Sequence, residues 1–159
     1  MKKIAVKLFF VLVFSVVFIF SVSAQTISVG SAIEKSSVEL DSKNKGTITL
    51  TIPKELHINS NQPTSEYMIP TAVKFSSNQA KITKISYPKG KNKKFDFSEV
   101  PINVYEGKAI IKFDFSVPKT LKTKIIKIRA IVSYQACTNE ICYQPQKKEI
   151  FLTTKVKEY

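Results

Sequence analysis

The sequence contains few residues of the types that build metal and nucleotide sites. Its 159 residues include one His, two Cys, four Gly and no Trp. One His and two Cys cannot fill a four-ligand zinc site without carboxylates, and the lone His57 leaves no Ser-His-Asp pattern. None of the glycines falls in a GxGxxG or GxxxxGKS/T string, so nucleotide binding has no support. We therefore expect neither a metal nor a cofactor.

Acidic residues are also scarce, with 12 Asp and Glu against 25 Lys and Arg and a net charge of +13. The lysines are spread along expected strands, as at Lys122, Lys124 and Lys127, and are not clustered with aromatic residues. This spacing indicates solvated faces, so we expect no nucleic-acid partner. Weak attraction to anionic lipid or to an acidic protein surface stays open.

The first 24 residues have the layout of a secretory signal peptide. Lysines near the start precede an apolar run over residues 8–22, which ends in a small-x-small pattern at Ala24. The run is shorter than the roughly 20 residues that span a bilayer, which favours cleavage over a retained anchor. No Cys follows the run, so a lipoprotein anchor is not indicated. We expect cleavage after Ala24, leaving residues 25–159 as one exported domain.

Along the rest of the chain the apolar residues alternate with a period of two. Residues 47–52, 109–117, 124–134 and 150–156 show this alternation most clearly, and shorter runs lie at 27–29, 37–40, 72–75 and 82–87. Alternation is typical of half-buried antiparallel strands, and no stretch keeps a helical period. About eight short strands in this length predict an all-β, antiparallel β-sandwich. Between them, residues 57–63 are interpreted as a turn-rich segment and residues 88–94 as a basic loop.

The two cysteines, Cys137 and Cys142, are separated by four residues, and an expected strand ends just before the first. A four-residue hairpin loop would place them opposite each other, within the range that a disulfide can bridge. An exported pair of this kind should be able to oxidise. The bridge would close only a short loop, worth about 2 kcal/mol by chain entropy, so spacing alone leaves open a structural staple or a redox pair.

Two strings of the sequence resemble those of one protein family. YQACTNEICYQP (residues 134–145) resembles the active-site hairpin of the N-terminal periplasmic domain of DsbD-type thiol:disulfide interchange proteins. LHINSNQP (residues 56–63), followed by Ile69-Pro70-Thr71, is similar to an earlier block of that family. The resemblance extends from about Ile27 to Val156, with the two strings in the right order and at the right distance.

The resemblance implies an immunoglobulin-like sandwich that acts as a periplasmic thiol-disulfide oxidoreductase. In the family, the cysteine pair takes electrons from a thioredoxin-like domain fed through a membrane segment. It passes them to periplasmic disulfide isomerases and cytochrome-maturation thioredoxins. Because no membrane segment or thioredoxin-like domain follows Tyr159, we expect a stand-alone domain, monomeric, with a separate thioredoxin-like or DsbD-type membrane donor. The alternative is a non-catalytic secreted binding module whose hairpin disulfide is structural.

The resemblance also implies roles for particular residues. Cys137 and Cys142 are the redox pair, and Cys142 forms the mixed disulfide with partners. Tyr134, Tyr143 and Pro145 flank and support the hairpin.

Family members shield the pair with a cap loop, for which the matching stretch is residues 93–97. Phe95 is the expected shielding ring and Phe97 the second, although both could be plain core aromatics. Lys93 and Lys94 stand where acids are usual and would favour a thiolate if they approach the sulfurs.

Two further polar residues near these strings have less specific roles. We expect a structural hydrogen-bonding role for His57, since it lies in a turn-like string. Glu140, inside the cysteine loop, is expected to be a solvated carboxylate at the loop tip.

Overall fold

The computed structural model describes residues 26–65 and 67–157 of the chain. The expected signal peptide, residues 1–24, lies outside these described residues. Across the described part of the chain, no helix is long and apolar enough to cross a membrane.

Twelve strands in the described residues form three sheets of four strands each. Sheet A has the order β1 (Ser28–Ile33), β3 (Lys43–Thr51), β9 (Lys108–Ser116), β6 (Lys81–Ser86). Sheet B has the order β2 (Ser37–Val38), β12 (Gln146–Val156), β10 (Ile125–Tyr134), β5 (Ala72–Ser76). Sheet C has the order β11 (Ala136–Cys137), β4 (His57–Asn59), β8 (Ile102–Tyr105), β7 (Lys91–Lys93).

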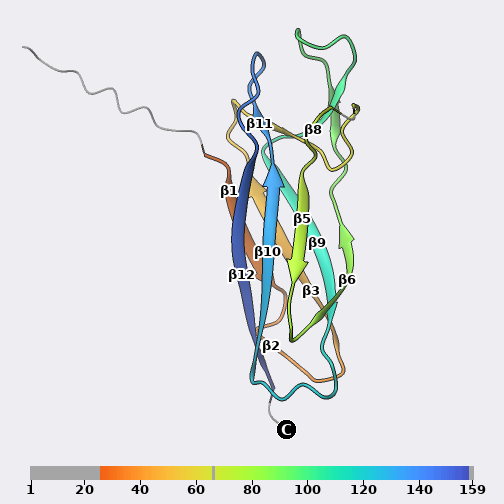
Figure 1. Ribbon diagram of the computed structural model, residues 1–159, viewed down its shortest axis with the longest axis vertical. Coiled ribbons are helices and arrows are strands. Elements are labelled where there is room, and N and C mark those ends of the chain that lie inside the picture. Colours follow the sequence, from red (N-terminus) through yellow and green to blue (C-terminus); the bar gives the residue numbers. More distant parts are fainter. Residues whose placement is uncertain (1–25, 66, 158–159) are drawn as a thin grey trace, which may run out of the picture.

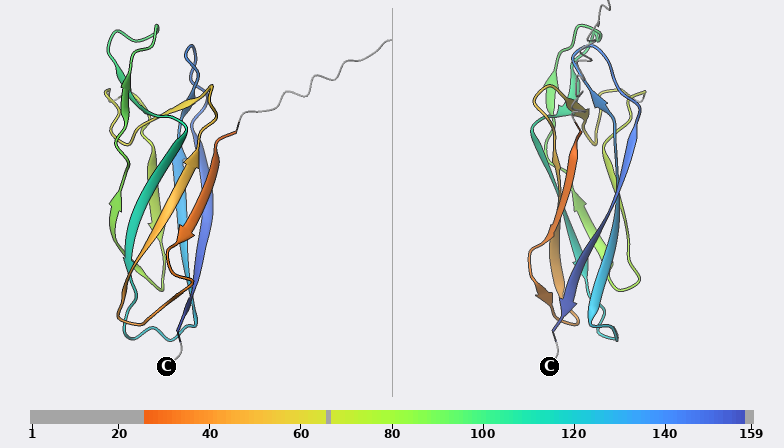
Figure 2. Two further views of the ribbon diagram at one scale, coloured as in Figure 1. Left: turned by 180° about the vertical axis from the view of Figure 1, so that it is seen from behind. Right: turned by 90° about the vertical axis from the view of Figure 1, so that its left-hand side faces the viewer.

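Sheets A and B face each other and form the sandwich, whereas sheet C lies at one end of it (Figures 1 and 2). Strand pairing is antiparallel except between β2 and β12, which run parallel. The architecture is an immunoglobulin-like antiparallel β-sandwich. This confirms the sandwich predicted from the alternation and the immunoglobulin-like fold that the resemblance implied.

The core between sheets A and B consists of the alternating apolar side chains of the long strands. On β10, every second residue from Ile126 to Tyr134 is 1% exposed or less, and β9 buries Ile111, Phe113 and Phe115 in the same way. Leu152 of β12, which is paired with Ile128 of β10, is also buried and extends this apolar layer. All eight predicted strand positions correspond to strands. In β3, β9 and β10, a one-residue shift would turn the buried apolar set toward water.

The four strands of sheet C differ from the prediction. Residues 57–59 were interpreted as part of a turn, but they form β4, and residues 91–93 of the expected basic loop form β7. Strand β4 is buried at all three positions, so it shows no alternation. Strands β7, β8 and β11 have only two to four residues each, too few to establish a period of two.

Sheet C positions two loops at the same end of the molecule (Figure 1). One is the hairpin of residues 138–145, which follows β11, and the other is the loop of residues 94–101 between β7 and β8. We call the second the cap loop. Strand β12 runs from this end to the opposite end of the sandwich. The two strings that carry the family resemblance thus meet in one small sheet.

Candidate functional site: the cysteine hairpin and the cap loop

Cys137 and Cys142 form a disulfide across a tight hairpin, with their Cα atoms 4.0 Å apart. The two residues are paired as antiparallel neighbours, as their four-residue spacing predicted. Backbone hydrogen bonds close the hairpin on both sides of the pair. The N–H of Thr138 donates to the carbonyl of Ile141, and the N–H of Tyr143 donates to the carbonyl of Ala136, each at 2.8 Å.

The two cysteines differ in their access to solvent. Cys137, at the end of β11, is 1% exposed, whereas Cys142 is exposed on the outer strand of the hairpin. Ile141 and Tyr143 on either side of Cys142 are also exposed, at 57% and 46%. One sulfur of the pair therefore belongs to a residue that a partner can reach, and the other to a residue buried in the domain.

The residues expected to support the hairpin occupy different environments. Tyr134 is buried, its hydroxyl lies 3.2 Å from Oε1 of Gln146, and burial raises the pKa of this hydroxyl. Tyr143 and Pro145 are exposed on the segment that leads from Cys142 to β12. Gln135 donates from Nε2 to the carbonyl of Tyr143 at 3.1 Å. The buried anchor of the hairpin is thus Tyr134, and Gln135 ties the two sides together.

His57 lies next to the buried cysteine. Strand β4 pairs with β11 so that His57 is opposite Cys137, and the imidazole is buried, with 2% of the residue exposed. Its ring stacks on Phe95 with the centroids 4.3 Å apart and 21° between the planes. The hydrogen-bonding role expected for His57 stays a prediction. Packing holds this side chain in place.

The cap loop begins with one buried and one exposed aromatic ring. Phe95 is 4% exposed and packs in a small cluster with Ile102 and Val104 of β8 and with Met68. Phe97 is 47% exposed and stacks on Phe95 with the centroids 5.3 Å apart. The structure therefore brings Phe95 onto the residue that is paired with Cys137 and leaves Phe97 outside.

An ion pair flanks the stacked rings. Nζ of Lys93 lies 2.6 Å from Oε1 of Glu106 and 5.5 Å from the centroid of the Phe95 ring. Glu106 stands in the turn between β8 and β9, which Gly107 closes with a φ of 65°. Lys94 is exposed. The ammonium group of Lys93 is thus paired with the carboxylate of Glu106, a residue that the sequence patterns did not single out.

Burial lowers the pKa of His57 below its ordinary value of 6.5, and the positive charge of Lys93 lowers it further. The carboxylate of Glu106 acts in the opposite direction and raises it. The net result is a lowered pKa, so the imidazole is neutral at pH 7. The site therefore combines a disulfide, a buried neutral imidazole and an aromatic cover.

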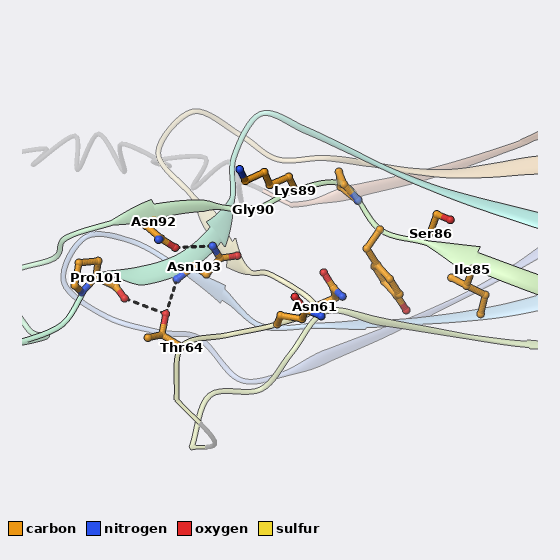
Figure 3. Close-up of a pocket in the computed structure, with 12 residues that line it drawn as sticks. Asn61, Thr64, Ile85, Ser86, Lys89, Gly90, Asn92, Pro101 and Asn103 are labelled. Atoms are coloured by element: carbon orange, nitrogen blue, oxygen red, sulfur yellow. Dashed lines mark hydrogen bonds between the residues drawn. The ribbon is translucent and has the colours of Figure 1, made fainter.

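An open cleft of about 980 Å³ lies on the β7 side of sheet C, among polar side chains (Figure 3). Many of these groups bond to one another. Nδ2 of Asn103 donates to Oδ1 of Asn92 at 2.6 Å, and the Thr64 hydroxyl joins the carbonyl of Pro101 and the N–H of Asn103. The Thr64 bonds tie the end of the cap loop at Pro101 to the segment that follows β4, and the Asn103–Asn92 bond joins β8 to β7 beside the loop. The cleft thus forms part of the support of the cap.

The fold and the hairpin define a class: an all-β, immunoglobulin-like domain with a cysteine pair at one end of the sandwich. The family model for the N-terminal domain of thiol:disulfide interchange protein DsbD matches residues 23–154. The chain belongs to this family, whose domains are thiol-disulfide exchange modules. The resemblance drawn from the two sequence strings is confirmed. No curated protein sequence matches the chain.

The chain is also similar to solved structures of low sequence identity. The N-terminal periplasmic domain of ScsB from Proteus mirabilis is similar with a TM-score of 0.51 and 9% identity. That match covers 80% of this chain and 45% of the ScsB chain. The DsbD N-terminal domain of Neisseria meningitidis in its reduced form gives a TM-score of 0.49 and 14% identity, covering 80% of this chain and 85% of that one. At 9% identity the likeness to the ScsB domain is one of fold alone.

Proposed function

We propose that this domain is a periplasmic thiol-disulfide relay whose Cys137–Cys142 pair carries two electrons between other proteins. The donor is a thioredoxin-like protein or a DsbD-type membrane protein. The acceptor is a periplasmic disulfide isomerase or a cytochrome-maturation thioredoxin. Membership of the interchange family and the cysteine pair at the tip of the sandwich support this function.

The observation that carries the proposal is the unequal exposure of the two cysteines. Thiol-disulfide exchange needs one sulfur that a partner thiolate can attack, which suits the exposed Cys142. Cys137, 1% exposed, is suited to close or open the internal bond after Cys142 has joined the partner. A staple that only stabilised the hairpin would not need this asymmetry.

The cap loop would protect the pair between encounters. Phe95 covers His57, and Phe97 lies outside it as the more movable ring. A partner would attack the exposed Cys142, while the closed cap would keep small thiols away from the buried Cys137. Tyr143 and Ile141, both exposed beside Cys142, offer apolar surface for the partner.

Export would place the domain where such partners occur. Residues 1–24 would act as the signal peptide, with cleavage after Ala24, and the mature domain would work in the periplasm as a monomer. Mass spectrometry of the protein recovered from the periplasm checks this, since the mature chain should begin at Gln25.

The decisive experiment measures the reduction potential of the Cys137–Cys142 pair by equilibration with glutathione or dithiothreitol buffers. A relay should have a potential near those of exchange proteins, between about −120 and −270 mV. The oxidised domain should also be reduced by thioredoxin in the presence of thioredoxin reductase and NADPH. A Cys142→Ala variant serves as the control that cannot cycle.

A potential below about −300 mV, with no reduction by thioredoxin, would instead support the structural alternative. The domain would then be a secreted binding module with a stapled hairpin. The reduction potential therefore distinguishes the relay from the structural alternative.

A further inference from the structure

Cys137 lies in a row of paired residues at the end of sheet C. Cys142 is its partner on one side and His57 its partner on the other. Directly opposed residues of antiparallel strands point to the same face, with their Cβ atoms about 4.5–5.5 Å apart. The imidazole of His57 is therefore the neighbour of the Cys137 side chain on the side away from Cys142.

This placement bears on a chemical requirement of exchange. A thiol must lose its proton before its sulfur can attack a disulfide. Cys142 is exposed and can give its proton to water, but Cys137 is 1% exposed, so water has little access to it. A base inside the domain is needed if the buried thiol is to react quickly.

His57 has the properties of such a base. It is buried, it is paired with Cys137 across two strands, and its ring stacks on Phe95. Burial and Lys93 keep its pKa below 6.5, so the ring is neutral and able to accept a proton at pH 7.

The other groups packed around His57 are less suitable. They are Phe95 of the cap loop, Lys93 of β7 and Glu106 of the β8–β9 turn. Phe95 does not titrate, Lys93 is a cation, and Glu106 is held in the ion pair with Lys93.

We propose that His57 is the general base that takes the proton from the Cys137 thiol when the reduced domain passes electrons to a partner disulfide. This role rests on the relay function proposed above. A nucleophile beside a base held by its own neighbours is the general arrangement for activating a thiol.

The exchange with the partner disulfide takes place in two stages. The Cys142 thiolate attacks one sulfur of the partner disulfide, so a mixed disulfide forms and the first partner thiolate leaves. His57 then accepts the Cys137 proton, and the Cys137 thiolate attacks the sulfur of Cys142. The internal disulfide forms, the second partner thiolate leaves with the electron pair, and the proton on His57 passes to it or to water. The domain loses two electrons and the partner gains two.

Ellman's reagent separates the two stages, because each releases one coloured thionitrobenzoate. When the reduced domain is mixed with excess reagent, the first release reports attack by Cys142 and the second reports closure by Cys137. A Cys137→Ala variant should give the first release alone, which assigns the phases.

We expect His57→Gln to slow the second release at least tenfold at pH 7 and to change the first less than twofold. His57→Phe, which keeps an aromatic ring against Phe95, should slow it similarly. Raising the pH toward 9 should narrow the difference, because hydroxide then removes the Cys137 proton directly. Second releases in both variants that match the wild type in rate and in pH profile would overturn the proposal.

A measurement on the wild-type domain covers the case in which the variants do not fold. His57 is the only histidine, so its NMR titration gives its pKa without assignment. In the reduced domain, the rate of the second release should level off above that same pKa. A rate that rises through it with no inflection would refute the role of His57.

The two proposals fail in different ways. A domain that passes the potential and thioredoxin tests but shows no effect of His57 is a relay without this base. A domain that fails those tests loses the relay function itself.

Discussion

The ring of Phe95 stacks on the imidazole of His57, with 4.3 Å between the centroids. Because His57 is paired with Cys137, this stack links the cap loop to the cysteine hairpin through one side chain. The two loops lie about 40 residues apart in the sequence and have no strand pairing in common. A change in the position of the cap is therefore expected to change the surroundings of the disulfide.

Removing the Phe95 ring should loosen the cap and open the buried, Cys137 side of the disulfide. Phe95 is 4% exposed in a small cluster, so Phe95→Ala should lower the free energy of unfolding by about 3 kcal/mol, near the lower end for a buried Phe. We also expect the disulfide to be reduced several-fold faster by dithiothreitol. Denaturant unfolding and the second-order rate of reduction check the two effects.

Phe97→Ala is the matched control for this change, because Phe97 lies in the same loop but is 47% exposed. Phe97→Ala should lower the free energy of unfolding by less than about 1 kcal/mol. If Phe95→Ala lowers stability but leaves the reduction rate unchanged, Phe95 is a core residue and does not shield the pair.

The charge of Lys93 should be measurable at His57. Lys93 lowers the pKa of the imidazole, and its partner Glu106 raises it. Lys93→Ala removes the first effect and leaves the carboxylate unpaired, so the pKa of His57 should rise. Lys94→Ala, one residue away and exposed, should leave it unchanged. NMR titration of the single histidine checks both variants, and equal values in the two would contradict the ion-pair geometry.

The sandwich could be predicted from the sequence because its strands are long and each buries one face. Buried and outward-facing side chains alternate over the ten residues of β10, and a shift of one residue would expose the buried set. The cysteine hairpin was also predictable, since four residues between Cys137 and Cys142 fix the loop length.

Sheet C was not predictable in the same way. Its strands are two to four residues long, and their pairing depends on contacts between segments far apart, such as β4 with β11. The position of His57 beside Cys137 follows from this pairing. The ion pair between Glu106 and Lys93 likewise joins two separate segments of the chain. A Glu-Gly pair between two apolar segments is a weak turn signal, and nothing in the sequence connects it to Lys93.

The segment that leads into β7 should favour glycine over larger residues at position 90. A Cβ atom there would lie 1.9 Å from Oδ1 of Asn103 and 3.0 Å from Cβ of Ser60. Gly90→Ala should therefore displace Asn103 and lower the free energy of unfolding by about 1–3 kcal/mol. Gly30→Ala is the control, because the nearest atom to a Cβ there is 4.0 Å away. Equal stability of the two variants in denaturant would show that Asn103 moves aside freely.

Reducing the disulfide should weaken the domain without unfolding it. The bond closes a loop of about six residues, for which chain entropy gives about 2 kcal/mol. The sandwich core buries large side chains such as Phe113 and Phe115 independently of this hairpin. We expect the reduced domain to keep its circular dichroism spectrum and to unfold at lower denaturant concentration with the same slope. Loss of the folded signal on reduction would mean that the disulfide is a structural requirement and would count against the relay.

The stability of the domain should fall as the pH drops through the range in which His57 titrates. Burial keeps the pKa of His57 in the folded domain below 6.5, the value expected for the unfolded chain. Below about pH 6.5 the unfolded chain therefore binds a proton that the folded domain resists, and the free energy of unfolding decreases. One proton limits this slope to about 1.4 kcal/mol per pH unit.

Above pH 7 the stability that comes from the neutral His57 ring is fully present. It is lost progressively as the pH falls toward the pKa of His57 in the folded domain. In His57→Gln the same range should be flatter, because the single histidine is the main group that titrates there. Denaturant unfolding of the wild type and the variant at pH 5, 6, 7 and 8 checks the difference. Parallel curves would mean that the imidazole takes up its proton as easily in the folded domain as in the unfolded chain, in contradiction to its burial between Phe95 and Cys137.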